Sequence, residues 1–174
     1  MSEFNTYEYV VGVKKGASVT LKKLGMLALY FVFVVLWFVF GFATKFYPLL
    51  ALIPITLWIL IFLTWRYVNV EYEYSFVSGE MTVSKIFGAR TRKKILNIRI
   101  KNCTLIAPLS ENKEKVKAFA PVKATYALSC ADSPEAYVAL YECDGTRGAL
   151  YFDANEKALK MFRFYNAPAT VIKK

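Results

Sequence analysis

The residues best suited to chemistry form a basic run in the second half of the chain. Four of the six fall within five positions and two follow shortly after: Arg90, Arg92, Lys93, Lys94, Arg99 and Lys101. Clustered guanidinium and ammonium groups bind phosphate oxygens through charge-assisted hydrogen bonds. We interpret residues 88–94 as a loop between two strands. The run predicts a site for anionic lipid or a protein partner, and the alternative is an ordinary solvated basic loop.

Catalytic chemistry has little support in this sequence. The chain has no histidine, the residue that most often transfers protons at neutral pH. Glu71 and Glu73 lie two positions apart in an alternating segment, on the side expected to face solvent. Ser84 and Lys85 are neighbours in sequence, so in a strand they point to opposite faces. We therefore expect no catalytic residues, no cofactor and no enzyme activity.

Three cysteines, Cys103, Cys130 and Cys143, form an odd set without a CxxC spacing. Disulfides need pairs, and a structural zinc site needs four ligands. Each cysteine stands in an alternating apolar context. We expect three buried thiols in a reducing compartment, and no metal site.

Two apolar runs, 24–43 and 46–65, contain no Asp, Glu, Lys or Arg. A helix of twenty residues is about 30 Å long, the thickness of the hydrocarbon core of a bilayer. A pair of buried helices in a soluble bundle would keep a polar stripe, and a signal peptide would have a shorter apolar run. The runs therefore predict a transmembrane helical hairpin over residues 24–66.

The flanking charges predict how this hairpin is oriented. Lys14, Lys15, Lys22 and Lys23 precede the first run and Arg66 follows the second, whereas the connection carries Lys45 alone. Lys and Arg near membrane spans stay on the cytoplasmic side. We therefore expect a multi-pass protein of the cytoplasmic membrane with both termini in the cytoplasm.

Several residues at the ends of the runs have the types that anchor helices at the membrane interface. They are Lys22, Lys23, Tyr47, Trp65 and Arg66. Pro54 should kink the second helix, because proline removes a backbone hydrogen bond. Trp37 and Trp58 fall within the runs, and their indole N–H groups favour a partner helix. Self-association into a homo-oligomer is left open.

The remaining chain, residues 67–174, has the mixed charge of a soluble domain, and residues 1–23 are expected to be a cytoplasmic N-terminal segment. Residues 67–174 hold 17 of the 23 Lys and Arg residues and 11 of the 13 Asp and Glu residues. Apolar side chains alternate with polar ones in short segments, which is typical of strands. Seven strands are expected: 68–76, 81–87, 96–100, 103–107, 126–130, 136–143 and 148–152.

Turn and cap signals connect these strands. Ser78-Gly79 and Asp144-Gly145 predict tight hairpins, and a slip of the alternation near Lys85 predicts a bulge. Residues 110–123 are expected to be an exposed connection with room for one helical turn. A helix should follow Asp153, with Asp153 as its cap and Glu156 three residues later.

Seven strands and one C-terminal helix resemble a pleckstrin-homology (PH) barrel. The segments EYEYSFVSGE (71–80), RTRKK (90–94), IAP (106–108) and NEK (155–157) are similar to an uncharacterised family of small bacterial two-span membrane proteins with a PH-like domain. The resemblance implies an α+β membrane protein, in which an N-terminal transmembrane hairpin precedes a PH-like seven-stranded bent sheet or barrel with a C-terminal helix. It supplies no catalytic residues.

Animal PH domains grip phosphoinositides mainly from the first hairpin loop, and the corresponding segment 77–80 has no basic residue here. This departure disfavours specific phosphoinositide recognition. Nucleic acid is also disfavoured, because the aromatic residues follow core spacing and do not interleave with the basic ones. The expected partners are the lipid bilayer and an unidentified protein.

These features predict a membrane-anchored binding or assembly module at the inner leaflet. The alternative is an accessory subunit of a transport or envelope-synthesis complex. In that case the hairpin makes the contacts, through Trp37, Trp58 and the kink at Pro54.

Overall fold

The structure of the chain is a computed structural model that describes residues 6–13, 17–88, 90–130, 132–143 and 145–173. It divides into two compact units. Unit 1 comprises Met1–Lys14, Glu71–Ile86 and Arg92–Lys174, and unit 2 comprises Lys15–Val70 and Phe87–Thr91. Residues 6–13 therefore belong to unit 1, although the sequence analysis placed residues 1–23 in a separate segment.

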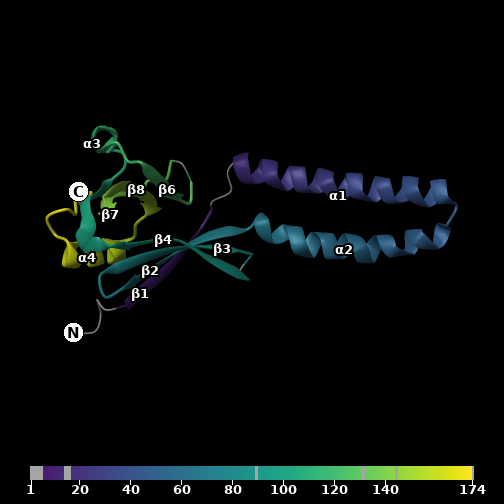
Figure 1. The fold of residues 1–174 in the computed structure, drawn as a ribbon, viewed down its shortest axis with the longest axis horizontal. Helices are drawn as coiled ribbons and strands as arrows, with labels where there is room; N and C mark the ends of the chain where they lie inside the picture. Colours follow the sequence, from purple (N-terminus) through teal and green to yellow (C-terminus); the bar gives the residue numbers. More distant parts are fainter. Residues whose placement is uncertain (1–5, 14–16, 89, 131, 144, 174) are drawn as a thin grey trace. The chain divides into compact units, whose positions relative to one another are not determined.

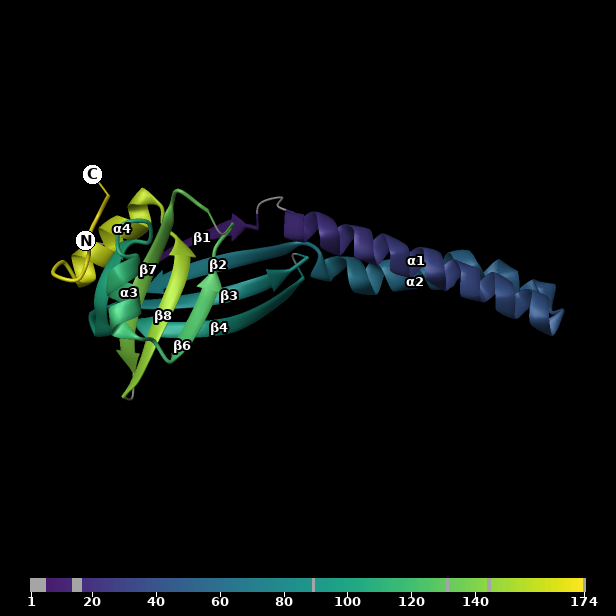
Figure 2. The ribbon, with the colours of Figure 1, turned by 90° about the horizontal axis from the view of Figure 1, so that it is seen from above.

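Unit 2 is a helical hairpin whose two arms lie side by side, seen apart in Figure 1 and overlapping in Figure 2. Its elements are α1 (Ala17–Thr44), the 3₁₀ helix η1 (Tyr47–Leu52), α2 (Ile53–Thr64) and the 3₁₀ turn η2 (Trp65–Tyr67). Two stretches are long and apolar enough to cross a membrane, Val19–Thr44 and Tyr47–Tyr67. They match the predicted spans 24–43 and 46–65. Two of the predicted orienting charges, Lys14 and Lys15, lie outside the described residues.

Two specific contacts join the arms of the hairpin. The hydroxyl oxygens of Tyr30 in α1 and Thr64 in α2 lie 2.7 Å apart and share a hydrogen bond. Near the connection, Gly41 leaves room for the side chain of Leu50, which would lie 2.6 Å from a Cβ at that position. An apolar span gains from pairing its few hydroxyl groups internally, because lipid offers them no partner.

Pro54 falls where η1 passes into α2, rather than inside a continuous α-helix. The backbone N–H of Ile53 bonds to the carbonyl of Leu50, an i to i+3 bond, and Pro54 occupies the first turn of α2. Proline has no N–H, so it fits this turn at little cost. The prediction placed Pro54 inside a continuous helix that it should kink, whereas in the structure Pro54 stands at the start of α2, next to a change of helix type.

Unit 1 consists of two four-stranded sheets (Figure 1). The first sheet has the order β1-β2-β3-β4, formed by Thr6–Gly12, Val70–Val77, Glu80–Phe87 and Thr91–Arg99. The second has the order β5-β7-β8-β6, formed by Cys103–Pro108, Ala136–Cys143, Thr146–Asp153 and Lys123–Ala127. The turn residues Ser78 and Gly79 both have positive φ, as a tight hairpin requires. In the second predicted turn, Asp144 lies outside the described residues.

Among the described residues the structure has eight strands, not the seven that were expected. The strand expected at 126–130 overlaps β6 only at residues 126 and 127, and β1 was not predicted at all. This strand pairs antiparallel with β2 along its full length, from Thr6 opposite Val77 to Gly12 opposite Glu71. Tyr7, Tyr9 and Val11 alternate toward the core, as in any half-buried strand. The signal was present in the sequence, but it is short and immediately precedes a dominant apolar run.

The core of unit 1 lies between the sheets and the C-terminal helix α4 (Glu156–Tyr165). Phe162 of α4 contacts Phe76 of the first sheet and Phe152 of the second, with ring centroids 5.2 and 5.4 Å apart. The predicted cap of α4 is wrong: the side chain of Asn155 accepts the capping bond from the N–H of Ala158 at 2.8 Å. Asp153 is instead a buried residue of β8.

A short helix, α3 (Lys113–Phe119), covers the second sheet through Val116, where the sequence allowed for one helical turn.

Buried polar groups connect the two sheets. The hydroxyl of Tyr9 in β1 donates to the carbonyl of Asp153 at 2.7 Å, and the hydroxyl of Tyr74 in β2 donates to the carbonyl of Ala127 in β6. The Asp153 carboxylate accepts a bond from the N–H of Ser129. Burial raises the pKa of both tyrosines. They therefore stay neutral donors at physiological pH.

We predict that unit 1 folds without the hairpin when residues 13–70 are replaced by an Asn-Gly turn. Gly12 and Glu71 are paired neighbours, so a two-residue connection suits the ladder. The shortened chain should be soluble and show a cooperative thermal transition by circular dichroism. A chain that starts at residue 67 lacks β1 and should melt at a clearly lower temperature, because Tyr74 and Phe76 lose the ring contacts of Tyr7 and Tyr9. Equal melting temperatures would show that β1 adds no stability.

Candidate functional site

The predicted basic loop is wrong, because most of it is a strand. Thr91–Arg99 form β4, at the edge of the first sheet. Residues 91–94 carry no apolar alternation, so pairing with β3, and not burial, is what makes them extended. The six basic residues consequently separate into different environments.

Arg92 forms an ion pair with a buried carboxylate. Its Nη2 lies 2.6 Å from Oε1 of Glu73, a side chain that is only 7 % exposed. The expectation that Glu73 faces solvent is therefore wrong. The reason is that β2 lies between β1 and β3, with Val10 paired opposite Glu73. Because a buried carboxylate needs a partner, Arg92 serves the fold more than any ligand.

Arg99, at the other end of β4, also forms an ion pair with a carboxylate. Its Nε donates to Oε1 of Glu80 at 3.1 Å, and Asn97 donates to the other carboxylate oxygen. These hydrogen bonds, that of Asn97 first, lower the pKa of Glu80. The pair lies in a polar hollow of about 390 Å³ that also contains Glu142. Two carboxylates make this hollow a poor site for an anion.

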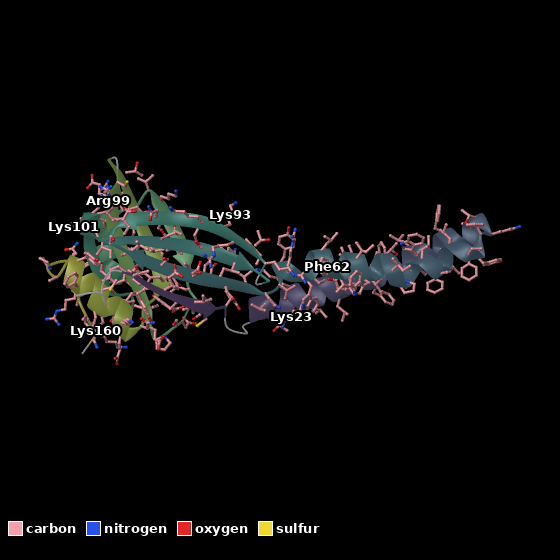
Figure 3. All side chains as sticks on the ribbon, turned by 90° about the horizontal axis from the view of Figure 1, so that it is seen from below. Lys23, Phe62, Lys93, Arg99, Lys101 and Lys160 are labelled. Atoms are coloured by element: carbon pink, nitrogen blue, oxygen red, sulfur yellow. The ribbon has the colours of Figure 1, made fainter. Side chains whose placement is uncertain are left out.

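Lys93, Lys94 and Lys101 are exposed, and no ion pair involves them in the described part of the chain. Figure 3 shows Lys93 well separated from Arg99 and Lys101. The six residue steps from position 93 to position 99 place these two backbone positions about 20 Å apart along the extended strand. Lys93 and Lys94 are thus the free part of the predicted cluster.

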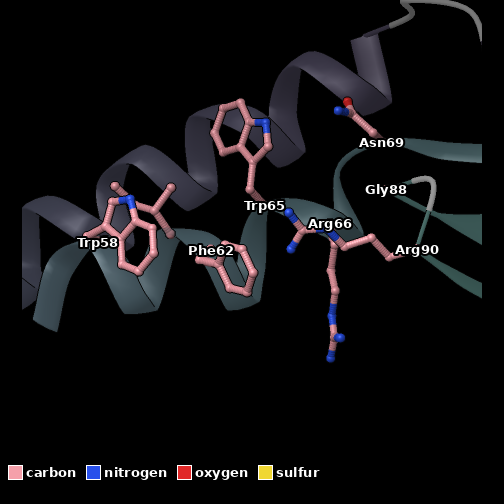
Figure 4. Close-up of a pocket in the computed structure, with 8 residues that line it drawn as sticks. Trp58, Phe62, Trp65, Arg66, Asn69, Gly88 and Arg90 are labelled. Carbon is pink, nitrogen blue, oxygen red and sulfur yellow. The ribbon is translucent and has the colours of Figure 1, made fainter. Parts of the chain in front are cut away.

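A second site lies within unit 2, where α2 and η2 meet the turn after β3 (Figure 4). It is a cavity of about 270 Å³. Aromatic and aliphatic side chains line it together with two arginines, one amide and one glycine: Trp58, Ile61, Phe62, Trp65, Arg66, Arg90, Asn69 and Gly88. We call this cavity the arginine pocket. Its lining contains no acidic residue.

Both guanidinium groups of the arginine pocket rest on aromatic rings. That of Arg90 lies 4.1 Å from the centroid of Phe62, and that of Arg66 lies 4.9 Å from the centroid of Tyr67. Nη2 of Arg66 donates to the Tyr67 hydroxyl at 2.9 Å, whereas its Nε is buried without an acceptor. Among the described residues, neither arginine pairs with a carboxylate. A buried charged donor without an acceptor is costly, so this arrangement suits an anion.

Gly88 shapes the wall of the arginine pocket. It has φ of +56°, and a Cβ at this position would lie 2.9 Å from Cβ of Arg66 and 3.0 Å from its Cα. Its N–H donates to the carbonyl of Asn69 at 2.8 Å, which fixes the turn against the end of the hairpin. Only glycine combines this backbone conformation with so close an approach.

Sequence reasoning named four of the eight residues of this pocket, in separate roles. Arg90 belonged to the basic run, Trp65 and Arg66 were interfacial anchors, and Trp58 was expected to favour a partner helix. The structure brings the four together. Phe62, Asn69 and Gly88 were missed. No local signal marks them, because the pocket joins segments about twenty positions apart.

The other predicted anchors lie at the two ends of unit 2. Lys22 and Lys23 are near the start of α1, at the same end as Trp65 and Arg66, and Figure 3 shows Lys23 and Phe62 near this end. Tyr47 is exposed at the opposite end, where η1 begins. This distribution is compatible with the predicted interfaces.

The expectation of three buried thiols holds only for Cys103. Cys130 is half-buried and Cys143 is exposed, because it ends β7 at a hairpin turn. In the described ranges, no group of three or more His, Cys, Asp or Glu residues is arranged to hold a metal ion.

We predict that a maleimide will modify Cys143 in the folded chain and leave Cys103 intact. Burial raises the pKa of Cys103 from 9.0 to about 12, so its reactive thiolate is on the order of a thousandfold rarer at neutral pH. Peptide mass spectrometry after brief labelling in detergent measures both sites. Unfolding in guanidinium should make Cys103 reactive. Labelling of Cys103 at the rate of Cys143 before unfolding would contradict the burial of β5.

Comparisons with known proteins place the chain by family alone. A family model described as "Bacterial PH-like domain (DUF6106)" matches residues 5–172. The comparisons with curated proteins and with solved structures found no match. The family match spans β1, the helical hairpin and both sheets, as well as the arginine pocket. The chain therefore belongs to this bacterial PH-like domain family of unknown function.

Proposed function

We propose that the chain is a membrane-anchored PH-like binding module whose helical hairpin crosses the cytoplasmic membrane. The observation that carries this proposal is the exposure of the hairpin. None of the most apolar window of Tyr47–Tyr67 is buried, and only 11 % of that of Val19–Thr44. Large apolar side chains such as Phe31, Leu36 and Trp58 are more than half exposed. Water would strongly oppose so much exposed apolar surface, whereas lipid covers it.

The proposed orientation keeps both termini in the cytoplasm. Lys22, Lys23 and Arg66 lie at one end of the hairpin, with Lys45 alone at the other. Unit 1 then faces the inner leaflet, which is anionic and attracts basic groups.

Within this proposal, Lys93 and Lys94 attract the anionic leaflet. Both are exposed and free of carboxylates among the described residues, unlike Arg92 and Arg99. Each well-placed lysine contributes about 1 kcal/mol near such a surface. We propose a binding role rather than a catalytic one.

We predict that reversing Lys93 and Lys94 to Glu weakens binding to vesicles rich in phosphatidylglycerol about tenfold or more. The shortened soluble unit described above and co-sedimentation with vesicles make the measurement possible. Arg92 is left intact, because a Glu there would face the buried carboxylate of Glu73.

The control reverses Lys113 and Lys115, two exposed residues of α3, which changes the net charge equally. If both pairs weaken binding alike, only net charge matters and the proposed role of β4 is wrong. Retained binding after reversal of Lys93 and Lys94 would also reject it.

An apolar hollow on one face of α1 favours a second candidate function. Phe33, Leu36, Trp37, Val39, Phe40 and Ala43 line an apolar hollow of about 530 Å³. Trp37 makes no hydrogen bond within the described residues, although its ring contacts Phe33. A partner helix would fill this hollow and accept the indole N–H. In this role the chain is an accessory subunit of a membrane complex.

We predict that, in the subunit role, replacing the hairpin with unrelated spans abolishes co-purification of the partner in mild detergent. Unit 1 should remain folded, as its thermal transition would report. Substitution of Trp37 by Leu alone should reduce the recovered partner severalfold. Unchanged recovery after hairpin replacement would assign any partner to unit 1 instead.

A further inference from the structure

We infer that the arginine pocket binds the phosphodiester group of one anionic phospholipid from the leaflet around the hairpin. The inference rests on the proposed insertion of the hairpin, but it does not need the lysines of β4. It assigns a discrete site with its own residues, in contrast to diffuse attraction by a basic surface.

The chemistry of the pocket fits this group. Two arginines line a cavity without a carboxylate, and Nε of Arg66 is buried with no acceptor in the described chain. A phosphodiester offers two negatively charged oxygens, and guanidinium binds such oxygens with two parallel hydrogen bonds. The amide of Asn69 adds a neutral donor at the same wall.

The position of the pocket fits a lipid as the source of that phosphate. Trp58, Phe62 and Trp65 lie on the last turns of the second candidate span, which ends at Tyr67, and Arg66 is part of its final turn. Arginine and tryptophan at the end of a span lie at headgroup depth. The aromatic wall then contacts the upper acyl and glycerol region while the arginines meet the phosphate.

The size of the pocket limits what it holds. Its volume of about 270 Å³ is slightly below the roughly 300 Å³ at which typical small-molecule pockets begin. It therefore holds one headgroup, and the acyl chains remain in the bilayer. The two positive charges favour phosphatidylglycerol over phosphatidylcholine, whose headgroup carries its own cation.

The experiment is native mass spectrometry of the full chain released from nanodiscs, with phosphatidylglycerol and phosphatidylcholine mixed equally. The expected wild-type result is a dominant species with one phosphatidylglycerol. The double variant R66Q/R90Q should retain about tenfold less of it, as expected for the loss of charge-assisted bonds. The control K113Q/K115Q removes two charges from exposed positions of α3, so the net charge changes equally, and it should retain wild-type levels.

Two further variants separate a built pocket from general attraction. R66K/R90K keeps both charges but loses the paired geometry, so retention should fall. Gly88→Ala keeps both arginines and crowds Arg66, so retention should fall as well. A surface effect predicts wild-type retention for both, and that result overturns the proposal. Equal loss in K113Q/K115Q overturns it too.

Soluble glycerophosphoglycerol, added at increasing concentration, distinguishes lipid from a free phosphodiester. Displacement of bound lipid only at a large excess supports the leaflet as the source, whereas displacement at equal concentration overturns it.

Failure of the pocket proposal can also be distinguished from failure of the proposed function. If the hairpin is not inserted, the full chain stays in solution without detergent. If only the pocket is wrong, the chain still requires detergent and the arginine variants retain lipid normally.

Discussion

The antiparallel ladder between β1 and β2 is the constraint on which the rest of the structure depends. It pairs residues that are separated in sequence by the whole helical hairpin, from Gly12 opposite Glu71 to Thr6 opposite Val77. Closing so long a loop is entropically costly, and the cost must be offset by the ring contacts of Tyr7 and Tyr9 and by the bond from Tyr9 to Asp153. The hairpin is therefore an insertion between two paired strands of the soluble unit, rather than an anchor attached to its end.

This topology explains which parts of the fold could be predicted from the sequence. Long apolar runs and strict alternation are local signals, so both arms of the hairpin, most of the strands and α4 were predictable. The strand β1 has the same alternation over only seven residues, and nothing local indicates that its partner lies more than fifty positions away. The cap at Asn155 was missed because Asp153, an equally suitable cap by type, is held in β8 by pairing with Ala136.

The candidate site was harder to predict, because charge alone does not reveal which basic groups are available. Arg92 and Arg99 look equivalent to Arg90 in sequence, yet each has a carboxylate partner contributed by β2 or β3. Glu73 was predicted to be a surface residue because it occupies a polar position of an alternating segment, but β2 lies between β1 and β3, and Arg92 covers this carboxylate. Strand pairing thus decides which basic side chains remain available to bind a ligand. In the described chain these are Lys93, Lys94 and the two arginines of the pocket.

The arginine pocket shares its backbone with the soluble unit, which gives a bound headgroup a route to influence it. Asn69 immediately precedes β2, and Gly88 immediately follows β3; their backbones are joined by the bond from the Gly88 N–H to the Asn69 carbonyl. Arg90 continues from this turn toward β4. An anion held between Arg66 and Arg90 therefore links the end of the second span to the turn between β3 and β4. A guanidinium donor without an acceptor is costly, so the proposed phospholipid would stabilise the pocket and, with it, this turn.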